Sequence, residues 1–177
     1  METLSVSTDL SRRDLIVVSL HLLPRLRGNW VFMGILAAGT FAYLLYGMDE
    51  VSAVLLIAAV LASAAAAIVG LLSGFLINLI CGLLTVGKNS GVLGRHDLSI
   101  SPTGFVERTV VNQSQHSWDG IKSVMELGNY LVIIFNGYLI HIVPRRSFDS
   151  ADGFDSFATQ AKAWHDQAHA KLQSQQT

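Results

Sequence analysis

Hydrophobic and polar positions follow three patterns along the chain, and each pattern predicts a different kind of structure. In residues 28–87 almost all side chains are apolar, and the only charges are the adjacent Asp49 and Glu50. In residues 98–143 short apolar runs alternate with polar and turn residues, which is typical of β-strands. From Ser150 onward apolar residues recur at helical spacing. The first half therefore differs in kind from the second.

The apolar stretch predicts a hairpin of two membrane-spanning helices. A soluble protein distributes charge throughout because each amphipathic element needs a wet face. Residues 30–48 form a helix of about 28 Å, close to the ~30 Å hydrocarbon core of a bilayer. Residues 51–86 are too long for one span and contain no polar break. We therefore expect one span over residues 53–76, followed by a cytoplasmic extension or a bend.

Basic residues flank the hairpin and predict its orientation. They are Arg12, Arg13, Arg25 and Arg27 before it, and Lys88 and Arg95 after it. Because positive residues favour the cytoplasmic side, we expect both termini in the cytoplasm and the protein in the inner membrane. The bilayer is the first expected partner.

Small residues at a spacing of four predict where the two helices pack. The second helix carries this pattern at Ala62, Ala66, Gly70 and Gly74, and the first carries Gly34 and Ala38. Such positions allow helix backbones to approach closely. Packing within the hairpin is the favoured interpretation, and a homodimer is the alternative.

Residues 1–27 form an N-terminal cytoplasmic segment. Residues 4–7 alternate and predict a short strand, and Ser11 with Asp14 resembles a helix-capping box. The apolar residues that follow end at Pro24, which interrupts a helix. This helix either lies along the inner leaflet or packs against the remainder of the protein.

Residues 88–177 predict a cytoplasmic α+β domain. Turn signals separate about six strands, and Asn136-Gly137 is the strongest of them. The C-terminal helix has an apolar stripe formed by Phe154, Phe157, Ala161, Trp164, Ala168 and Leu172. An antiparallel sheet closed by this helix would bury the stripe.

Three short motifs in this region resemble the YcxB-like family. They are residues 98–105 with a Pro-x-Gly turn, residues 118–121 with a Trp-x-x-Ile pattern, and residues 142–148 with Pro-Arg-Arg-x-Phe. Two preceding transmembrane helices are also similar to that family. The resemblance implies a bacterial membrane protein with a pleckstrin-homology-like cytoplasmic domain, and it supplies no catalytic residues.

Arg145 and Arg146 are the leading candidates for ligand binding. A pair of guanidinium groups after a strand suits phosphate or carboxylate, including anionic lipid headgroups. The favoured alternative is that they pair with one of the carboxylates of Asp149, Asp152 and Asp155. Phe148 and Trp118 are further candidates, although a staple between strand and helix and a place in the core, respectively, are favoured for them.

Other chemistry is weakly indicated. His165 and His169 are one helical turn apart, but Asp166 follows where a zinc site would have Glu, and no third ligand follows, so we expect no metal. A net charge of −1 gives no attraction to nucleic acid. We expect neither cofactor nor enzymatic activity. The sequence favours a membrane-anchored binding or regulatory module with a protein or lipid partner; an accessory or immunity-type subunit that acts through its helices is the alternative.

Overall fold

The chain folds into two compact units, one of which is inserted into the other. The computed structural model describes residues 3–47, 50–87, 91–135 and 139–175. Residues 1–18 and 86–177 form one unit, here called the β domain, and residues 19–85 form the other, here called the helical hairpin. Residues 1–18 are therefore part of the β domain, whereas the sequence analysis treated residues 1–27 as a separate segment.

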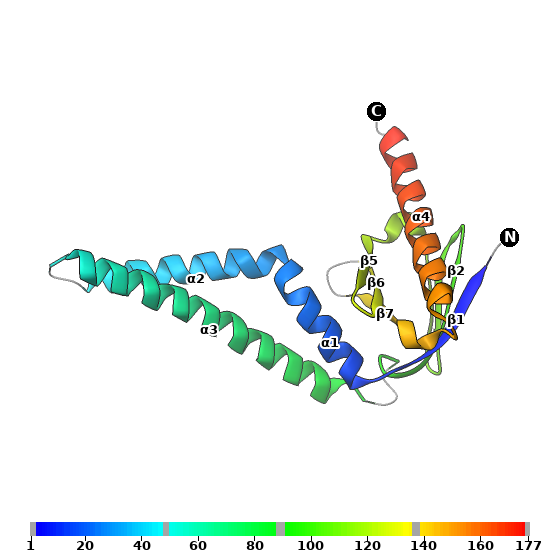
Figure 1. Cartoon of the computed structure of the whole chain (residues 1–177), viewed down its shortest axis with the longest axis horizontal. Helices are drawn as coiled ribbons and strands as arrows, with labels where there is room; N and C mark the ends of the chain where they lie inside the picture. Colours follow the sequence, from blue (N-terminus) through cyan, green and yellow to red (C-terminus); the bar gives the residue numbers. More distant parts are fainter. Residues whose placement is uncertain (1–2, 48–49, 88–90, 136–138, 176–177) are drawn as a thin grey trace. The chain divides into compact units, whose positions relative to one another are not determined.

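The β domain contains seven described strands in two antiparallel sheets (Figure 1). The four-stranded sheet consists of β1 (Leu4–Leu10), β2 (Gly94–Ser101), β3 (Gly104–Thr109) and β4 (Gln113–His116), in that order. The three-stranded sheet consists of β5 (Ser123–Leu127), β6 (Tyr130–Ile134) and β7 (Ile140–Pro144). The predicted strand positions agree well, but a 3₁₀ turn, η2 (Trp118–Gly120), divides them between two sheets. The predicted Asn136-Gly137 turn lies outside the described residues.

The N-terminal strand joins the β domain by pairing with β2. The antiparallel register places Leu4 opposite Ile100 and Leu10 opposite Gly94, although the whole hairpin lies between the two strands in the sequence. The predicted strand is thus confirmed and extends to Leu10. Without this pairing, β2 would have an open edge.

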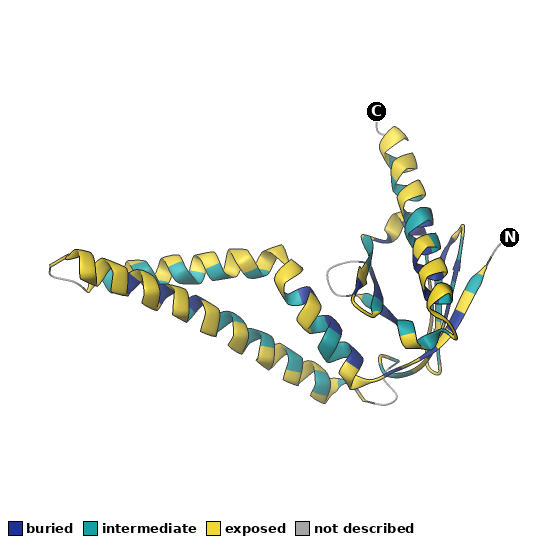
Figure 2. Cartoon of the chain, viewed as in Figure 1, coloured by how far each residue is buried: buried dark blue, intermediate teal, exposed yellow. Residues whose placement is uncertain are grey.

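The C-terminal helix closes the β domain through the predicted apolar stripe. In α4 (Ala151–Gln175), Phe154, Phe157 and Ala161 are buried and pack in one core with Trp118 and apolar residues of both sheets. Figure 2 shows these buried positions along the first half of α4. The α+β class of the chain is therefore confirmed.

The helical hairpin has two helices that are long and apolar enough to cross a membrane. These are α2 (Arg27–Tyr46), with 20 residues, and α3 (Ala53–Thr85), with 33. None of the most apolar part of α2 is buried and only 17% of that of α3, whereas the core helix of a soluble protein is mostly buried (Figure 2). The helix α3 continues without interruption to Thr85, so the chain does not leave the helix at residue 76. A short 3₁₀ turn, η1 (Leu23–Arg25), contains Pro24 and precedes α2.

The contact between α2 and α3 uses a stripe of small residues next to the predicted one. The buried residues of α3 are Ala59, Ser63 and Ala67, one position away from the predicted series and hence about 100° around the helix. Gly70, from the predicted series, also takes part in the contact. A Cβ at Gly70 would collide with the side chain of Leu36, so the glycine makes room for α2.

The other predicted packing positions are less buried than the observed stripe. Gly34 and Ala38 are exposed on α2, and Ala66 is only partly buried. A Cβ added at Gly34 or Gly74 would meet nothing within 4 Å. The physical reason is that the bulky Leu36, rather than a second small residue, fills the notch at Gly70. The face of α2 with Gly34 and Ala38 thus takes no part in the hairpin.

Candidate functional site

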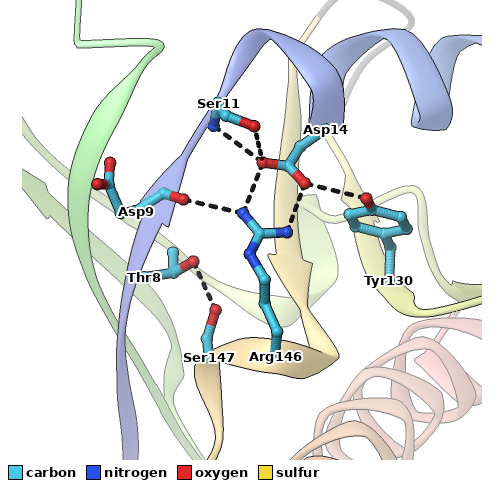
Figure 3. A network of polar contacts seen from close by, with 7 residues as sticks. All are labelled: Thr8, Asp9, Ser11, Asp14, Tyr130, Arg146 and Ser147. Carbon is cyan, nitrogen blue, oxygen red and sulfur yellow. Dashed lines mark hydrogen bonds and ion pairs between the residues drawn. The ribbon is translucent and has the colours of Figure 1, made fainter.

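A buried carboxylate at the start of α1 (Arg12–Leu22) organises a polar network in the β domain (Figure 3). The side chain of Asp14 is only 2% exposed. Arg146 donates two hydrogen bonds to its oxygens, from Nη1 to Oδ1 at 2.5 Å and from Nη2 to Oδ2 at 2.7 Å. The hydroxyl of Tyr130 donates to Oδ1 at 2.9 Å, and the N–H and hydroxyl of Ser11 donate to Oδ2 at 2.9 and 2.7 Å. The carboxylate therefore accepts five hydrogen bonds.

The network joins the two parts of the β domain that the hairpin separates in sequence. Arg146 lies in a 3₁₀ turn, η3 (Arg145–Ser147), directly after β7. Its Nη2 also donates to the carbonyl oxygen of Asp9 at 3.0 Å, and the hydroxyl of Ser147 donates to that of Thr8 at 2.6 Å (Figure 3). The predicted capping residues Ser11 and Asp14 are thus part of a tertiary contact as well as a helix cap.

The hydrogen bonds keep the network ionised. Burial of the Asp14 carboxylate raises its pKa, but the bonds from Arg146, Ser11 and Tyr130 outweigh burial, so the pKa lies well below its usual value. The bond to Asp14 raises the pKa of Arg146, and burial together with Asp14 raises that of Tyr130. A carboxylate that stays charged and whose oxygens already accept five hydrogen bonds suits a structural role better than proton transfer.

Arg145 points to a different carboxylate. Its Nη2 donates to Oδ1 of Asp155 at 2.7 Å, and its guanidinium lies 4.2 Å from the ring centroid of Phe154. Asp155 is one of the three acids that the sequence analysis named as alternative partners. The two predicted ligand-binding arginines therefore have separate partners within the protein, and binding of an external anion remains a prediction.

The two aromatic candidates lie in packed surroundings. Trp118 is 2% exposed and donates from Nε1 to the carbonyl oxygen of Ser101 at 2.8 Å. The Phe148 ring is 5.6 Å from the ring of Phe154 and 5.4 Å from that of Phe157 between centroids. Both contacts correspond to the core and staple alternatives that the sequence analysis favoured.

A second buried polar cluster, which the sequence analysis missed, lies between the two sheets. The Oε1 atom of Glu107 is 2.9 Å from Nδ1 of His96 and 2.8 Å from Nδ1 of His141. His116 packs beside them on Phe135, with ring centroids 4.0 Å apart. Each of the three Nε2 atoms is buried without a hydrogen-bond partner among the described residues.

The charge of Glu107 is stabilised by its histidine neighbours. Burial raises the pKa of Glu107, but hydrogen bonds from His141 and His96 lower it to about 2. Burial, followed by the charge of His141, lowers the pKa of His116. The cluster therefore combines a charged acceptor with a histidine that resists protonation.

The predicted absence of a metal site concerns His165 and His169. Their Nε2 atoms lie 3.1 and 2.8 Å from the carbonyl oxygen of Ile121, so both rings are directed at the backbone. In the part of the chain that the structure describes, no group of three or more His, Cys, Asp or Glu side chains is placed to hold a metal ion.

The model of the YcxB-like protein family matches residues 100–161. This stretch is similar to that family and is here called the YcxB-like segment. The resemblance found in the sequence motifs is thereby confirmed for this segment. No curated protein and no solved structure matches the chain.

The YcxB-like segment contains most of the residues described above. Trp118, Arg145, Arg146, Phe148 and Glu107 lie inside it. The partner of Arg146, Asp14, and one member of the histidine cluster, His96, lie outside it in the flanking strands and helix. The YcxB-like segment thus depends on residues before it in the sequence to complete both of its polar clusters.

Proposed function

We propose that this protein is a membrane-anchored binding or regulatory module whose β domain recognises a protein partner or inner-leaflet lipid. The observation that carries the proposal is the pairing of β1 with β2 across the helical hairpin. Because Leu10 lies opposite Gly94, both connections to the hairpin leave from one end of one sheet. Both ends of the hairpin must then lie on the same side of a membrane, and two spans meet this requirement.

The proposed orientation is with the β domain in the cytoplasm and the hairpin in the inner membrane. Arg25 precedes α2 and Arg27 is its first residue, whereas the only charged residues in the connection to α3 are Asp49 and Glu50. Cytoplasmic flanks are enriched in Lys and Arg, which supports this orientation. The exposed apolar surfaces of α2 and α3 are suited to lipid.

We propose a pleckstrin-homology-like architecture for the β domain. Its support is the combination of a four-stranded and a three-stranded antiparallel sheet with one closing C-terminal helix, together with the YcxB-like segment. We propose a binding role rather than an enzymatic one. The buried carboxylates of Asp14 and Glu107 are held ionised by neighbouring side chains, which suits structural roles.

A shallow hollow on the four-stranded sheet is the surface that we propose for a protein partner. It has a volume of about 340 Å³ and is lined by β1, β2 and β3, including Ser5, Ser7, Asp97, Ser99 and Arg108. Hydroxyl groups beside one acidic and one basic side chain suit a polar peptide surface.

Photo-crosslinking in native membranes tests this function. A photoreactive residue replaces Ser5 in the hollow or, as a control, the exposed Gln167 on α4, and crosslinked proteins are identified. The full chain is required, since β1 completes the sheet and a fragment of residues 88–177 would lack it. A partner captured from Ser5 but not from Gln167 supports the proposal. Equal capture at both positions, or none at either with no lipid adduct, argues against it.

The alternative function is an accessory or immunity-type subunit that acts through its transmembrane helices. The exposed face of α2 with Gly34 and Ala38 favours it, because small residues allow another helix to approach. Gly34→Leu would block such an approach without touching the contact at Gly70. Loss of a copurifying partner or dimer on a native gel would favour this alternative, and an unchanged complex would remove it.

A further inference from the structure

The turn between β3 and β4 presents two adjacent valines to solvent. Val110 is 91% exposed and Val111 is 57% exposed. Such turns usually carry Gly, Asn, Asp or Ser at their tips. Here the N–H of Thr109 donates to the carbonyl of Asn112 at 2.7 Å, and the Thr109 hydroxyl accepts from the N–H of Asn112 at 2.9 Å. The valines therefore sit at the tip of a turn that is fixed at its base.

The valine turn lies at the end of the sheet from which the hairpin connections leave. In the sheet register, Thr109 lies opposite His96, and Leu10 lies opposite Gly94. The turn between β2 and β3, which contains Thr103, lies at the other end of the same strands. Of these two turns, only the valine turn lies at the same end of the sheet as the connections to α1 and α3.

Few residues connect α3 to this end of the sheet. Residues 86–93 span at most about 28 Å when fully extended. The last turns of α3 remain apolar, with Ile80 53% and Leu84 78% exposed. Such residues favour hydrocarbon over water, so in a membrane the end of α3 stays at the bilayer surface. This step rests on the membrane anchoring proposed above.

Charge at this end of the sheet also favours lipid. Arg12 and Arg13 begin α1, one residue after the end of β1, and Arg95 and Arg108 lie near the ends of β2 and β3. All four are exposed. Only two exposed carboxylates, those of Asp9 and Asp97, stand among these residues on the described strands. The arginines therefore leave an excess of positive charge beside the valines. Anionic headgroups attract such residues.

We infer that the Val110–Val111 turn is a membrane-contacting element, which inserts into the surface of the same bilayer that holds the hairpin. The arginines around it face anionic headgroups, and the valines enter the interface below them. The β domain is thereby held against the membrane at one end, and its hollow on the outer face of the sheet keeps a defined direction relative to the lipid. The two connections to the hairpin and the inserted turn together fix this orientation better than the two connections alone.

Spin labels on the full chain in anionic proteoliposomes test the inference. With Cys81→Ser removing the native thiol, a cysteine replaces Asn112, which leaves both valines intact, or the matched control Thr103 at the other end of the sheet. We expect the label at position 112 to collide more with oxygen than with a water-soluble nickel chelate, as lipid-exposed labels do. We expect the label at position 103 to show the reverse.

Further labels separate failure of the inference from failure of the proposed function. A label replacing the exposed Leu61 of α3 reports whether the hairpin is in lipid. If position 61 is in lipid but position 112 is in water, the inference is overturned and the anchoring stands. If position 61 is in water, both fail. Val110→Asp combined with Val111→Asp should move the label at position 112 into water, and an unchanged signal would contradict a role of the valines.

Discussion

Replacing Arg146 would leave the buried carboxylate of Asp14 without its charged partner. Arg146→Met keeps most of the aliphatic side chain and removes both guanidinium bonds to Asp14. The carboxylate would then rely on Ser11 and Tyr130 while it remains almost fully buried. Removing one partner of a buried ion pair destabilises a protein by about 3–5 kcal/mol.

The expected magnitude lies at the lower end of that range. The side chain of Arg146 is 53% exposed, so the pair is only partly desolvated, and three donors to Asp14 remain. We expect a loss of about 3 kcal/mol at pH 7, which lowers the melting temperature of a domain of this size by roughly 12 °C. Arg145→Met is the matched control, because its pair with Asp155 is more exposed and should be worth less than about 1 kcal/mol.

The pH dependence of this loss of stability provides an independent test. In the native protein the pKa of Asp14 lies below its usual value, so its contribution to stability is present above the unfolded pKa and is lost on further acidification. In Arg146→Met, burial dominates and the pKa of Asp14 rises. Protonation then relieves the penalty, so the difference between the two proteins should shrink as pH falls from 7 to 4.

Thermal unfolding of the full chain in detergent micelles would measure both effects. With Trp30→Phe, the remaining tryptophans are Trp118 and Trp164, whose rings lie 6.1 Å apart in the core of the β domain. Their fluorescence therefore reports unfolding of that domain alone. Equal destabilisation by the variants at Arg145 and Arg146, or a difference that does not change with pH, would refute the assignment of Asp14 as a buried, partnered carboxylate.

Three further predictions concern the stability of other variants of the full chain. Glu107→Gln should lower the free energy of unfolding by about 2 kcal/mol at pH 7. The native protein should lose stability between pH 4.5 and 2 as Glu107 is protonated, and thermal melts across that range should not show this loss for the variant. Gly70→Leu should lower the temperature at which the helical circular dichroism of the hairpin is lost, because Leu36 occupies that space, whereas Gly74→Leu should leave it unchanged. Gly104→Ala should lose about 2 kcal/mol or more in tryptophan-fluorescence melts, because φ is +152° and the new Cβ would collide with the carbonyl of His116; native stability would contradict the described turn.

Local signals in the sequence predicted most elements, whereas the polar clusters required tertiary structure. Turn residues such as Pro102 and Gly104 separate the strands, and the stripe beginning at Phe154 indicated α4. The sequence analysis identified Asp14 as a helix cap, and Arg146 as either a ligand-binding residue or the partner of a carboxylate close by in the sequence. Nothing in the sequence joins two residues that are 132 positions apart.

Only part of the histidine cluster could be predicted from the sequence. The turn between β2 and β3 fixes their register, so His96 and Glu107 can be placed on neighbouring strands from the sequence. His141 belongs to the other sheet, and its approach to Glu107 depends on how the two sheets pack. The small-residue stripe of α3 was predicted differently: the periodicity was right, but the buried residues Ala59, Ser63 and Ala67 lie one position away from the predicted series, although Leu36 of α2 packs at the predicted Gly70.

The insertion of the hairpin between β1 and β2 has a consequence for biosynthesis. The ribosome makes β1 first, and its pairing partner is complete only after Ser101, about 5–20 s later at ordinary rates of synthesis. If the hairpin spans a membrane as proposed, the nascent N-terminus waits during that interval while α2 and α3 are inserted into lipid. A chain that inserted only one helix would strand its two sheet halves in different compartments and leave a domain that proteases can attack. Under the proposed function, the sheet could thus be completed only after both helices had been inserted.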